Sequence, residues 1–193
     1  GYRIAGVSRL SLGILSVSGE ALRDICRRHM VDEAKTSFAA ARRAGFENLN
    51  VDVIFGAPDQ STAAWAETLD RTVDLAPQHL SIYGLTIERG TPFGLRHARG
   101  TLPVPDEEAQ ATMCAYAQTT LERAGYLHYE ISNYALPGME SRHNRACWRG
   151  ASYLGLGVSA HSYDGDRRAW NTIDLNDYLT RIESSDLATE GSE

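Results

Sequence analysis

The chain has 193 residues, 42% hydrophobic and 23% charged, as expected for one globular domain or one domain with an appendage. Its formal net charge of −6 and the lack of a Lys/Arg cluster argue against a nucleic-acid-binding groove. No run of residues approaches the ~20 apolar positions that a transmembrane helix needs, and no signal-peptide pattern is present.

The three cysteines, Cys26, Cys114 and Cys147, lie far apart in the sequence. They form no C-x-x-C pair, no metal-ligand cluster and no obvious disulfide framework. We therefore expect a reducing, cytoplasmic setting. The chain begins at Gly1 and enters a strand almost at once. This start predicts that residues precede it in the natural protein, although a processed chain would begin in the same way.

The first half of the chain alternates strands and helices. Alternating apolar residues predict a strand over 7–16, and helical spacing predicts helices over 19–29 and 32–44. Residues 48–55 form a β-branched strand that ends in a Gly/Pro/Asp turn, and Ser61 is a good N-cap for a helix over 61–75.

The strand over 48–55 carries the first candidate site residue. Side chains alternate sides along a strand, so its two faces differ: Leu49, Val51, Val53 and Phe55 against Asn50, Asp52 and Ile54. An ionisable side chain in an apolar strand is costly unless a partner or ligand compensates for it. We therefore identify Asp52 as the residue around which a site is expected.

A third strand is predicted over 79–86, apolar at Leu80 and Ile82 and polar at Ser81 and Tyr83. Parallel sheets with both faces buried are usually apolar throughout. Three strands with one polar face each therefore favour a barrel-like sheet, with a ligand on the inner face and helices outside.

The second half is less regular. We expect a loop over 88–105 and the longest helix over 106–125, with Met113, Tyr116, Ala117, Leu121 and Ala124 among its inward residues. The expected elements after it are a strand over 128–132, a loop over 133–150, a glycine-rich strand over 153–162 and a helix over 174–182. The polar end, 184–193, is expected to fray.

Several segments together resemble the radical S-adenosylmethionine proteins related to oxygen-independent coproporphyrinogen III oxidase. These segments are SRLSLG (8–13), RRH (27–29), NVDVIFGAP (50–58) and LSIYGLTIERGTPF (80–93). Within that family, YEISN (129–133), HNRACW (143–148) and YLGLGVSAHS (153–162) resemble the heme chaperone branch. The resemblance runs from about Gly6 to Asn171.

The resemblance implies an α/β fold: the later half of a partial (βα)6 barrel over 1–100, followed by a small α+β family-specific region over 101–193. It also implies a [4Fe-4S] cluster, S-adenosylmethionine and heme as cofactors. The cluster is held by a C-x-x-x-C-x-x-C loop, which this sequence lacks. We therefore expect no cluster ligand in this chain and no radical chemistry by the chain as it stands.

Three residues match positions around S-adenosylmethionine in the family. Arg27 corresponds to an Arg that contacts the ligand carboxylate, which suits a guanidinium fork. Asp52 corresponds to an Asp that accepts hydrogen bonds from the ligand, and Thr86 to a backbone contact with the nucleoside. His161 is a further candidate for this site.

Each of these assignments has a structural alternative. Arg27 lies off the apolar stripe of its helix, as a solvated Arg would, and Asp52 can instead form a structural pair with Arg9. A buried structural His is the commoner role for a residue such as His161. Leu15 departs from the family, whose members commonly carry a Gln there as a cofactor contact.

His143 matches the His of the H-N-x-x-Y-W motif that the chaperone branch is thought to use for heme. A neutral imidazole is a competent axial ligand of heme iron, and the alternative is a loop His in solvent. Cys147 stands where Tyr is expected, and its thiol is itself an iron ligand. Gly155-x-Gly157 lacks the third glycine and the context of a dinucleotide fingerprint, so we interpret it as a close-approach strand.

The resemblance favours a heme chaperone that binds heme and delivers it to acceptor proteins. The alternative is the oxygen-independent oxidase, an enzyme that converts coproporphyrinogen III propionates to vinyl groups. The HNRACW segment and LTIERGTPF favour the chaperone. An inert fragment of either protein is the third hypothesis.

Overall fold

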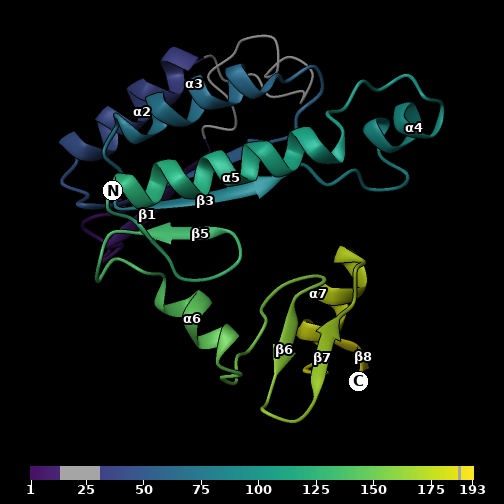
Figure 1. Ribbon diagram of the computed structural model, residues 1–193. Helices are drawn as coiled ribbons and strands as arrows, with labels where there is room; N and C mark the ends of the chain where they lie inside the picture. The colour runs from purple at the N-terminus through teal and green to yellow at the C-terminus, as the bar shows by residue number, and fades with distance from the viewer. Residues whose placement is uncertain (14–30, 187) are drawn as a thin grey trace. The chain divides into compact units, whose positions relative to one another are not determined.

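Three parallel strands form the centre of the larger of two compact units, which comprise residues 1–140 and 141–193. The computed structural model describes residues 1–13, 31–186 and 188–193 (Figure 1). The helix predicted over 19–29, which contains Arg27, lies outside the described residues, and so does Leu15 near the end of the strand predicted over 7–16. The division at residue 140 is one of compactness, and the boundary at residue 100 between the barrel and the family-specific region stays a prediction.

The strands of the first unit are β1 (Arg9–Gly13), β2 (Asn48–Phe55), β3 (His79–Gly84), β4 (Leu127–His128) and β5 (Asn133–Ala135). Their order is β1-β2-β3-β5-β4, with β1, β2 and β3 parallel and the other two pairings antiparallel. The register pairs Ser11 with Asn50, Asp52 with Ser81, and Ser81 with Asn133. Because paired residues point to the same side of a sheet, these polar side chains share one face.

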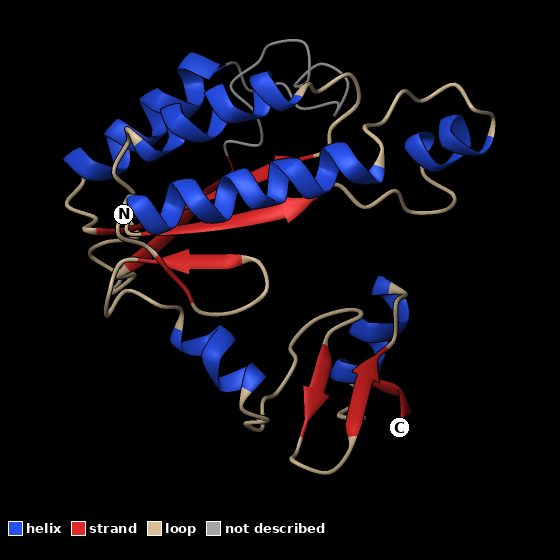
Figure 2. Cartoon of the chain, viewed as in Figure 1, coloured by secondary structure: helices blue, strands red, loops and turns tan. Residues whose placement is uncertain are grey.

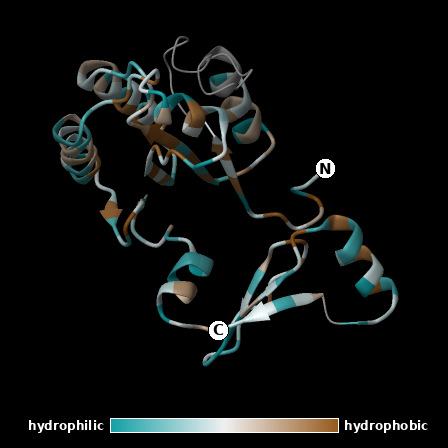
Figure 3. Ribbon diagram, turned by 90° about the vertical axis from the view of Figure 1, so that its right-hand side faces the viewer, coloured by the Kyte–Doolittle hydropathy of each residue, from teal (hydrophilic) through white to brown (hydrophobic). Residues whose placement is uncertain are grey.

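Helices α2 (Val31–Arg43), α3 (Thr62–Val73) and α5 (Glu107–Arg123) lie together on the other side of the strands (Figures 1 and 2). The core between them and the sheet contains large, fully buried side chains: Leu49, Val51, Val53, Trp65, Leu69, Leu80, Met113 and Leu121. Figure 3 shows the hydrophobic segments gathered on the strands beneath these helices. The predicted apolar face of β2 is confirmed for Leu49, Val51 and Val53.

Polar caps and one buried hydrogen bond fix the helices. The side chain of Ser61 accepts the Ala64 amide at 3.1 Å, and that of Asp106 accepts the Ala109 amide at 2.8 Å. The Trp65 indole Nε1–H donates to the Met113 carbonyl at 2.8 Å and so ties α3 to α5. The caps confirm the predicted helix starts. Tyr116 and Ala124, expected to face inward, are exposed.

One helix within residues 88–105 was not predicted. α4 (Pro92–Ala98) has Thr91 as its N-cap, which accepts the Gly94 amide at 3.0 Å, and proline in its first turn. None of its residues is buried, so it has no apolar stripe by which periodicity could detect it. The Thr91-Pro92 pair was the available indication of a helix start.

The predicted strand over 128–132 is wrong in its bounds. Residues 127–128 and 133–135 pair with each other as β4 and β5, and the residues between them make the turn. Asn133, Tyr134 and Ala135 are all buried. β5 extends the parallel sheet because Asn133 and Tyr134 find their partners on β3, which local alternation cannot indicate.

The second unit contains α6 (Arg142–Trp148), β6 (His161–Tyr163), β7 (Arg168–Asn171), α7 (Leu175–Glu183) and β8 (Thr189–Ser192). Its strands form an antiparallel sheet in the order β6-β7-β8. The predicted loop over 133–150 is therefore wrong at β5 and α6. The end of the chain does not fray as predicted, because β8 pairs with β7.

The glycine-rich strand predicted over 153–162 is also wrong, since only 161–163 form β6 and Tyr153 makes an isolated bridge to Tyr163. A side chain at Gly155 would collide with the backbone of His161. The interpretation of this glycine as a close-approach position is confirmed. Within the described ranges of the chain, no helix is both long and apolar enough to cross a membrane.

We predict that Trp65→Phe lowers the free energy of unfolding by about 2 kcal/mol, because it removes a buried hydrogen bond and leaves a cavity. Trp148→Phe, at a side chain that is 59% exposed, serves as control and should change it by less than ~0.5 kcal/mol. Urea unfolding followed by circular dichroism measures both. Equal losses in the two variants would show that Trp65 does not link α3 to α5.

Candidate functional site

The polar face of the first unit's sheet is centred on Asn50 in β2, which is only 4% exposed. Its amide nitrogen lies 2.7 Å from Oδ1 of Asp52 and 3.1 Å from the Ser81 hydroxyl, and it also donates to the Ser11 hydroxyl. Ser11 donates in turn to Oδ2 of Asp52 at 2.9 Å. Ser11 of β1 and Asn50 of β2 thereby hydrogen-bond the half-buried Asp52 carboxylate, and Ser81 of β3 is linked to it through Asn50.

The amide oxygen of Asn50 faces His79, the first residue of β3. Its Oδ1 lies 2.6 Å from Nδ1 of His79, and Nε2 of His79 lies 2.7 Å from the Tyr129 hydroxyl. Burial lowers the pKa of His79 to about 3, and the positive charge of Arg9 acts in the same direction. The imidazole is therefore neutral at physiological pH, with one nitrogen donating and the other accepting.

Arg9 in β1 does not form the ion pair with Asp52 that was the structural alternative for that carboxylate. Its Nη1 donates to Asn48 Oδ1 at 3.3 Å and to the Met139 carbonyl at 3.0 Å, while the hydrogen bonds to Asp52 come from Ser11 and Asn50. Partial burial lowers the pKa of Arg9, and nearby Tyr129 and Asp52 oppose that shift. Arg9 therefore supplies positive potential to this face.

Two buried polar atoms near these strands lack a partner among the described residues. One is Oδ1 of Asn133, which is paired in register with Ser81 on the polar face. The other is Nε2 of Gln60, whose Oε1 accepts the Gly56 and Ala57 amides at 2.7 and 3.3 Å and so holds the turn that follows β2. A buried polar atom without a partner is costly, so these two atoms are exceptions in a unit whose other buried polar groups described above are hydrogen-bonded.

The structure brings some of the predicted site residues together and leaves others apart. Asp52 lies within the polar face, and Thr86 is exposed two residues beyond the end of β3. His143 and His161 belong to the second unit, where both are exposed. The exposure of His161 excludes the buried structural role that was its alternative.

His143 lies on α6 one helical turn before Cys147. Its Nε2 is 3.8 Å from the Cys147 sulfur, and both side chains are exposed. Ser141 caps this helix by accepting the Asn144 amide. Arg142, Arg145 and Arg149 give the helix a strong positive charge, and the Trp148 side chain is 59% exposed. An accessible imidazole, a thiol, an indole and cationic groups thus occupy one short helix.

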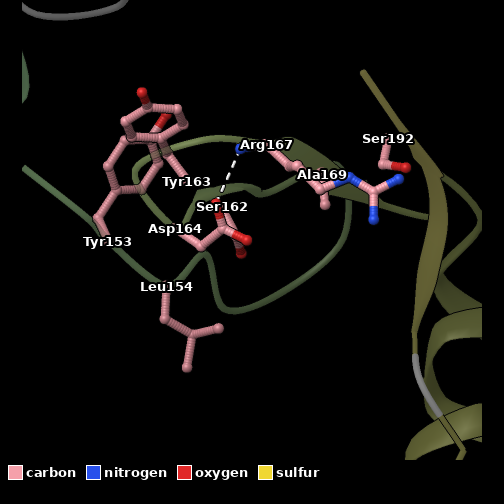
Figure 4. A pocket seen from close by; sticks show the side chains of 8 residues that line it. All are labelled: Tyr153, Leu154, Ser162, Tyr163, Asp164, Arg167, Ala169 and Ser192. Atoms are coloured by element: carbon pink, nitrogen blue, oxygen red, sulfur yellow. Dashed lines mark hydrogen bonds between the residues drawn. The ribbon is translucent and has the colours of Figure 1, made fainter. Parts of the chain in front are cut away.

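A hollow of about 270 Å³ lies in the second unit between Tyr153, Tyr163, Asp164 and Arg167 (Figure 4). Its acidic side chain is already used, because Asp164 accepts the Asp166 and Arg167 amides at 2.9 and 2.8 Å. These backbone hydrogen bonds lower the pKa of Asp164. The hollow is smaller than usual ligand pockets, and its polar groups serve the β6–β7 turn.

The described residues do not fit an iron–sulfur cluster. Such a cluster needs several cysteine thiolates converging on it. Cys114 and Cys147 are exposed on different helices, and no group of three or more His, Cys, Asp or Glu side chains in the described part of the chain could hold a metal ion. The polar face instead presents a hydrogen-bond acceptor, the Asp52 carboxylate.

Sequence reasoning missed His79, Tyr129 and Asn133 as members of the site. Asn50, Ser81 and Arg9 were placed on the polar sides of their strands, but the network depends on the register between strands and on the turn after β4. The position of His79 at the start of β3, on the same face as Ser81, was the one available indication.

No family model matches the chain. It is 36% identical over 178 residues to the Heme chaperone HemW of Bacillus subtilis (strain 168), an alignment that covers 92% of this chain and 47% of the relative. It is 40% identical over 161 residues to the Heme chaperone HemW of Escherichia coli (strain K12), covering 83% and 41%. The chain therefore spans about half the length of the curated relatives it matches.

Among solved structures, the chain is similar to coproporphyrinogen III oxidase (HemN) from Escherichia coli, described as a radical SAM enzyme. The TM-score is 0.81 at 24% identity, over all of this chain and 47% of that one. This likeness shows the fold. It confirms the expected later half of a radical SAM barrel followed by a small α+β region.

We predict that His79 makes the first unit sensitive to acid. Its pKa is about 3 when folded and about 6.5 when unfolded, so protons favour the unfolded chain as the pH falls from about 6.5 towards 3. Between pH 7.5 and 5, the wild type should lose about 2 kcal/mol more unfolding free energy than His79→Asn. Urea titrations at both pH values measure this difference. Equal losses in both proteins would contradict it.

Proposed function

Since the chain belongs to the radical S-adenosylmethionine proteins of the heme chaperone and coproporphyrinogen III oxidase group, we propose that it serves in binding heme and delivering it to acceptor proteins. The observation that carries this proposal is the exposed His143 imidazole on the cationic helix α6. The names of the relatives support the chaperone in preference to the oxidase.

The side chains of α6 suit a heme in three ways. His143 offers an imidazole nitrogen to the iron, and its exposure leaves it accessible to a large flat ligand. Trp148 offers an aromatic surface to the porphyrin ring. Arg142, Arg145 and Arg149 offer charge-assisted hydrogen bonds to the two propionates. Cys147, 3.8 Å from His143, is the competing ligand for the same iron.

The polar face of the sheet suits S-adenosylmethionine. Asp52 would accept hydrogen bonds from its donor groups, Arg27 would pair with its carboxylate, and the backbone at Thr86 would contact the nucleoside. When bound, this molecule supplies an adenosyl group activated by the sulfonium charge. The described residues provide no ligands for a cluster, so we derive no radical step from them.

We also propose that the protein works in the cytoplasm. The exposed thiols of Cys114 and Cys147 are both free, as they would be in a reducing cytoplasm. The alternative function is oxidation of coproporphyrinogen III, which the barrel fold shared with that oxidase supports. The two functions differ in whether heme or its porphyrinogen precursor occupies the protein.

We predict saturable binding of hemin in an anaerobic titration followed by Soret absorbance. His143→Ala should weaken it about tenfold, since loss of an axial ligand removes one strong metal–nitrogen bond. His97→Ala serves as the matched control, because His97 is an exposed imidazole of the other unit, on α4.

Equal binding by the wild type and His143→Ala would remove His143 from the heme site. Cys147→Ser, with Cys114→Ser as its control, would then test the thiol. Absence of binding in all variants would contradict the chaperone proposal and favour the oxidase, to be assayed with coproporphyrinogen III.

For the polar face, we predict that Asp52→Asn weakens the affinity for S-adenosylmethionine about tenfold in calorimetric titrations. The change removes a charge that strengthens hydrogen bonds from the ligand. Asp74→Asn makes the same charge change at an exposed residue that caps α3 and should leave the affinity unaltered. Similar affinities for both variants would place the ligand elsewhere.

A further inference from the structure

We propose that His79 is a positioning residue. Its ring, as the neutral Nδ1–H tautomer, fixes the orientation of the Asn50 amide, and through that amide it orients the Asp52 carboxylate. The geometry stands by itself, whereas the identity of the ligand that Asp52 receives rests on the proposed function. The residues concerned come from β2, β3 and the turn after β4.

The direction of the hydrogen bonds begins at Asp52. The Asn50 side chain places its nitrogen 2.7 Å from Oδ1 of Asp52. The reversed amide would bring an oxygen against a carboxylate oxygen at that distance, and two acceptors repel each other. The carboxylate therefore requires Asn50 to present its N–H group to Asp52 and its oxygen to His79.

The orientation of Asn50 then determines the tautomer of His79. Its Nδ1 lies 2.6 Å from the Asn50 oxygen, which can only accept, so Nδ1 must carry the proton. Because the ring is neutral, Nε2 is an acceptor, and the Tyr129 hydroxyl at 2.7 Å donates to it. The hydrogen bonds run in one direction, from Tyr129 through His79 and Asn50 to Asp52.

Burial makes this arrangement rigid. His79 is 1% exposed, Asn50 4% and Ser81 3%, so water does not compete for their hydrogen bonds. Ser81 contributes a second, longer contact to the Asn50 oxygen at 3.3 Å. Among the described residues, the Tyr129 hydroxyl after β4 contacts the His79 ring, and Arg9 on β1 adds a nearby positive charge. Burial and Arg9 both lower the pKa of His79 and keep the ring neutral.

The consequence is a carboxylate whose described hydrogen bonds leave acceptor positions open. Among the described residues, the donors to Asp52 are Asn50 at Oδ1 and Ser11 at Oδ2. A carboxylate has about four acceptor positions, so these two hydrogen bonds leave one position on each oxygen. The site is thus preorganised for a molecule that presents two donors, such as neighbouring hydroxyl groups or an ammonium group.

The decisive experiment records long-range ¹H–¹⁵N correlations of the histidine rings in the unaltered 193-residue chain at pH 7. We expect His79 as the pure Nδ1–H tautomer, unchanged between pH 7 and pH 5, beside the averaged tautomers of exposed His97. An Nε2–H tautomer, or an imidazolium at pH 7, would overturn the inference. This measurement needs no substitution and no ligand.

A pair of variants tests the positioning role. His79→Asn keeps a donor in place of Nδ1–H, whereas His79→Leu removes it. We expect His79→Leu to abolish the slow exchange of the Asn50 side-chain amide protons and to weaken S-adenosylmethionine binding about tenfold, and His79→Asn to stay within about threefold of wild type. Equal effects of both variants would show that His79 only packs in this unit and does not orient Asn50.

Failure of the proposed function has a different outcome. Suppose that His79 is the Nδ1–H tautomer and that the Asn50 amide protons exchange slowly only when residue 79 carries a donor. If the wild-type chain then does not bind S-adenosylmethionine, the positioning role holds and the ligand assignment fails. If S-adenosylmethionine binds but His79 is the other tautomer, the ligand assignment holds and the positioning role fails.

Discussion

The contact between the Asn50 amide and the Asp52 carboxylate is the constraint on which the polar side of the sheet depends. An Asp in a sheet that packs against three helices is costly unless its charge is compensated. Here the compensation comes from Asn50 and Ser11, on the same strand and its neighbour, while Arg9 makes its hydrogen bonds elsewhere. The hydrogen bonds of three strands therefore set the geometry of this carboxylate without closing it to a ligand.

The two faces of the sheet differ in role: one stabilises the first unit, and the other is the proposed ligand-binding face. The helix-covered face buries Leu49, Val51 and Leu80 completely, which stabilises the first unit. On the opposite face Asn50 hydrogen-bonds His79 and Ser81, whereas Oδ1 of Asn133 lacks a partner among the described residues. Because strand alternation assigns neighbouring residues to opposite faces, a single strand such as β2 serves both purposes.

The polar face could be predicted from alternation along the strands, and the helices α2, α3, α5 and α7 could be predicted from helical spacing and N-caps. Alternation also placed Asp52 on the same face of its strand as Asn50. It could not reveal His79 and Tyr129 as partners, because their contacts follow from the register of β2 with β3 and from the hairpin of β4 and β5. The errors after residue 125 have a similar cause: short strands there are selected by distant partners, and Gly155 approaches the His161 backbone outside any strand.

The second unit poses a separate question, since His143 and Cys147 occupy an exposed helix rather than a buried pocket. If the chain binds heme at α6 as proposed, exposed ligands would ease its release, because an enclosed site would hold heme more tightly. The thiol of Cys147 stands where the family motif has a phenol, and it would then compete with the imidazole as a softer ligand for iron.

A map of chemical-shift changes in the chain on addition of S-adenosylmethionine tests most directly whether the polar face of the sheet binds this ligand. We expect the side-chain amide resonances of Asn50 and Asn133 to move first, together with the backbone signals near Asp52 and Thr86. Changes confined to β6, β7 and β8, or spread over the helix-covered face, would show that the polar face of the sheet is not where this protein receives its ligand.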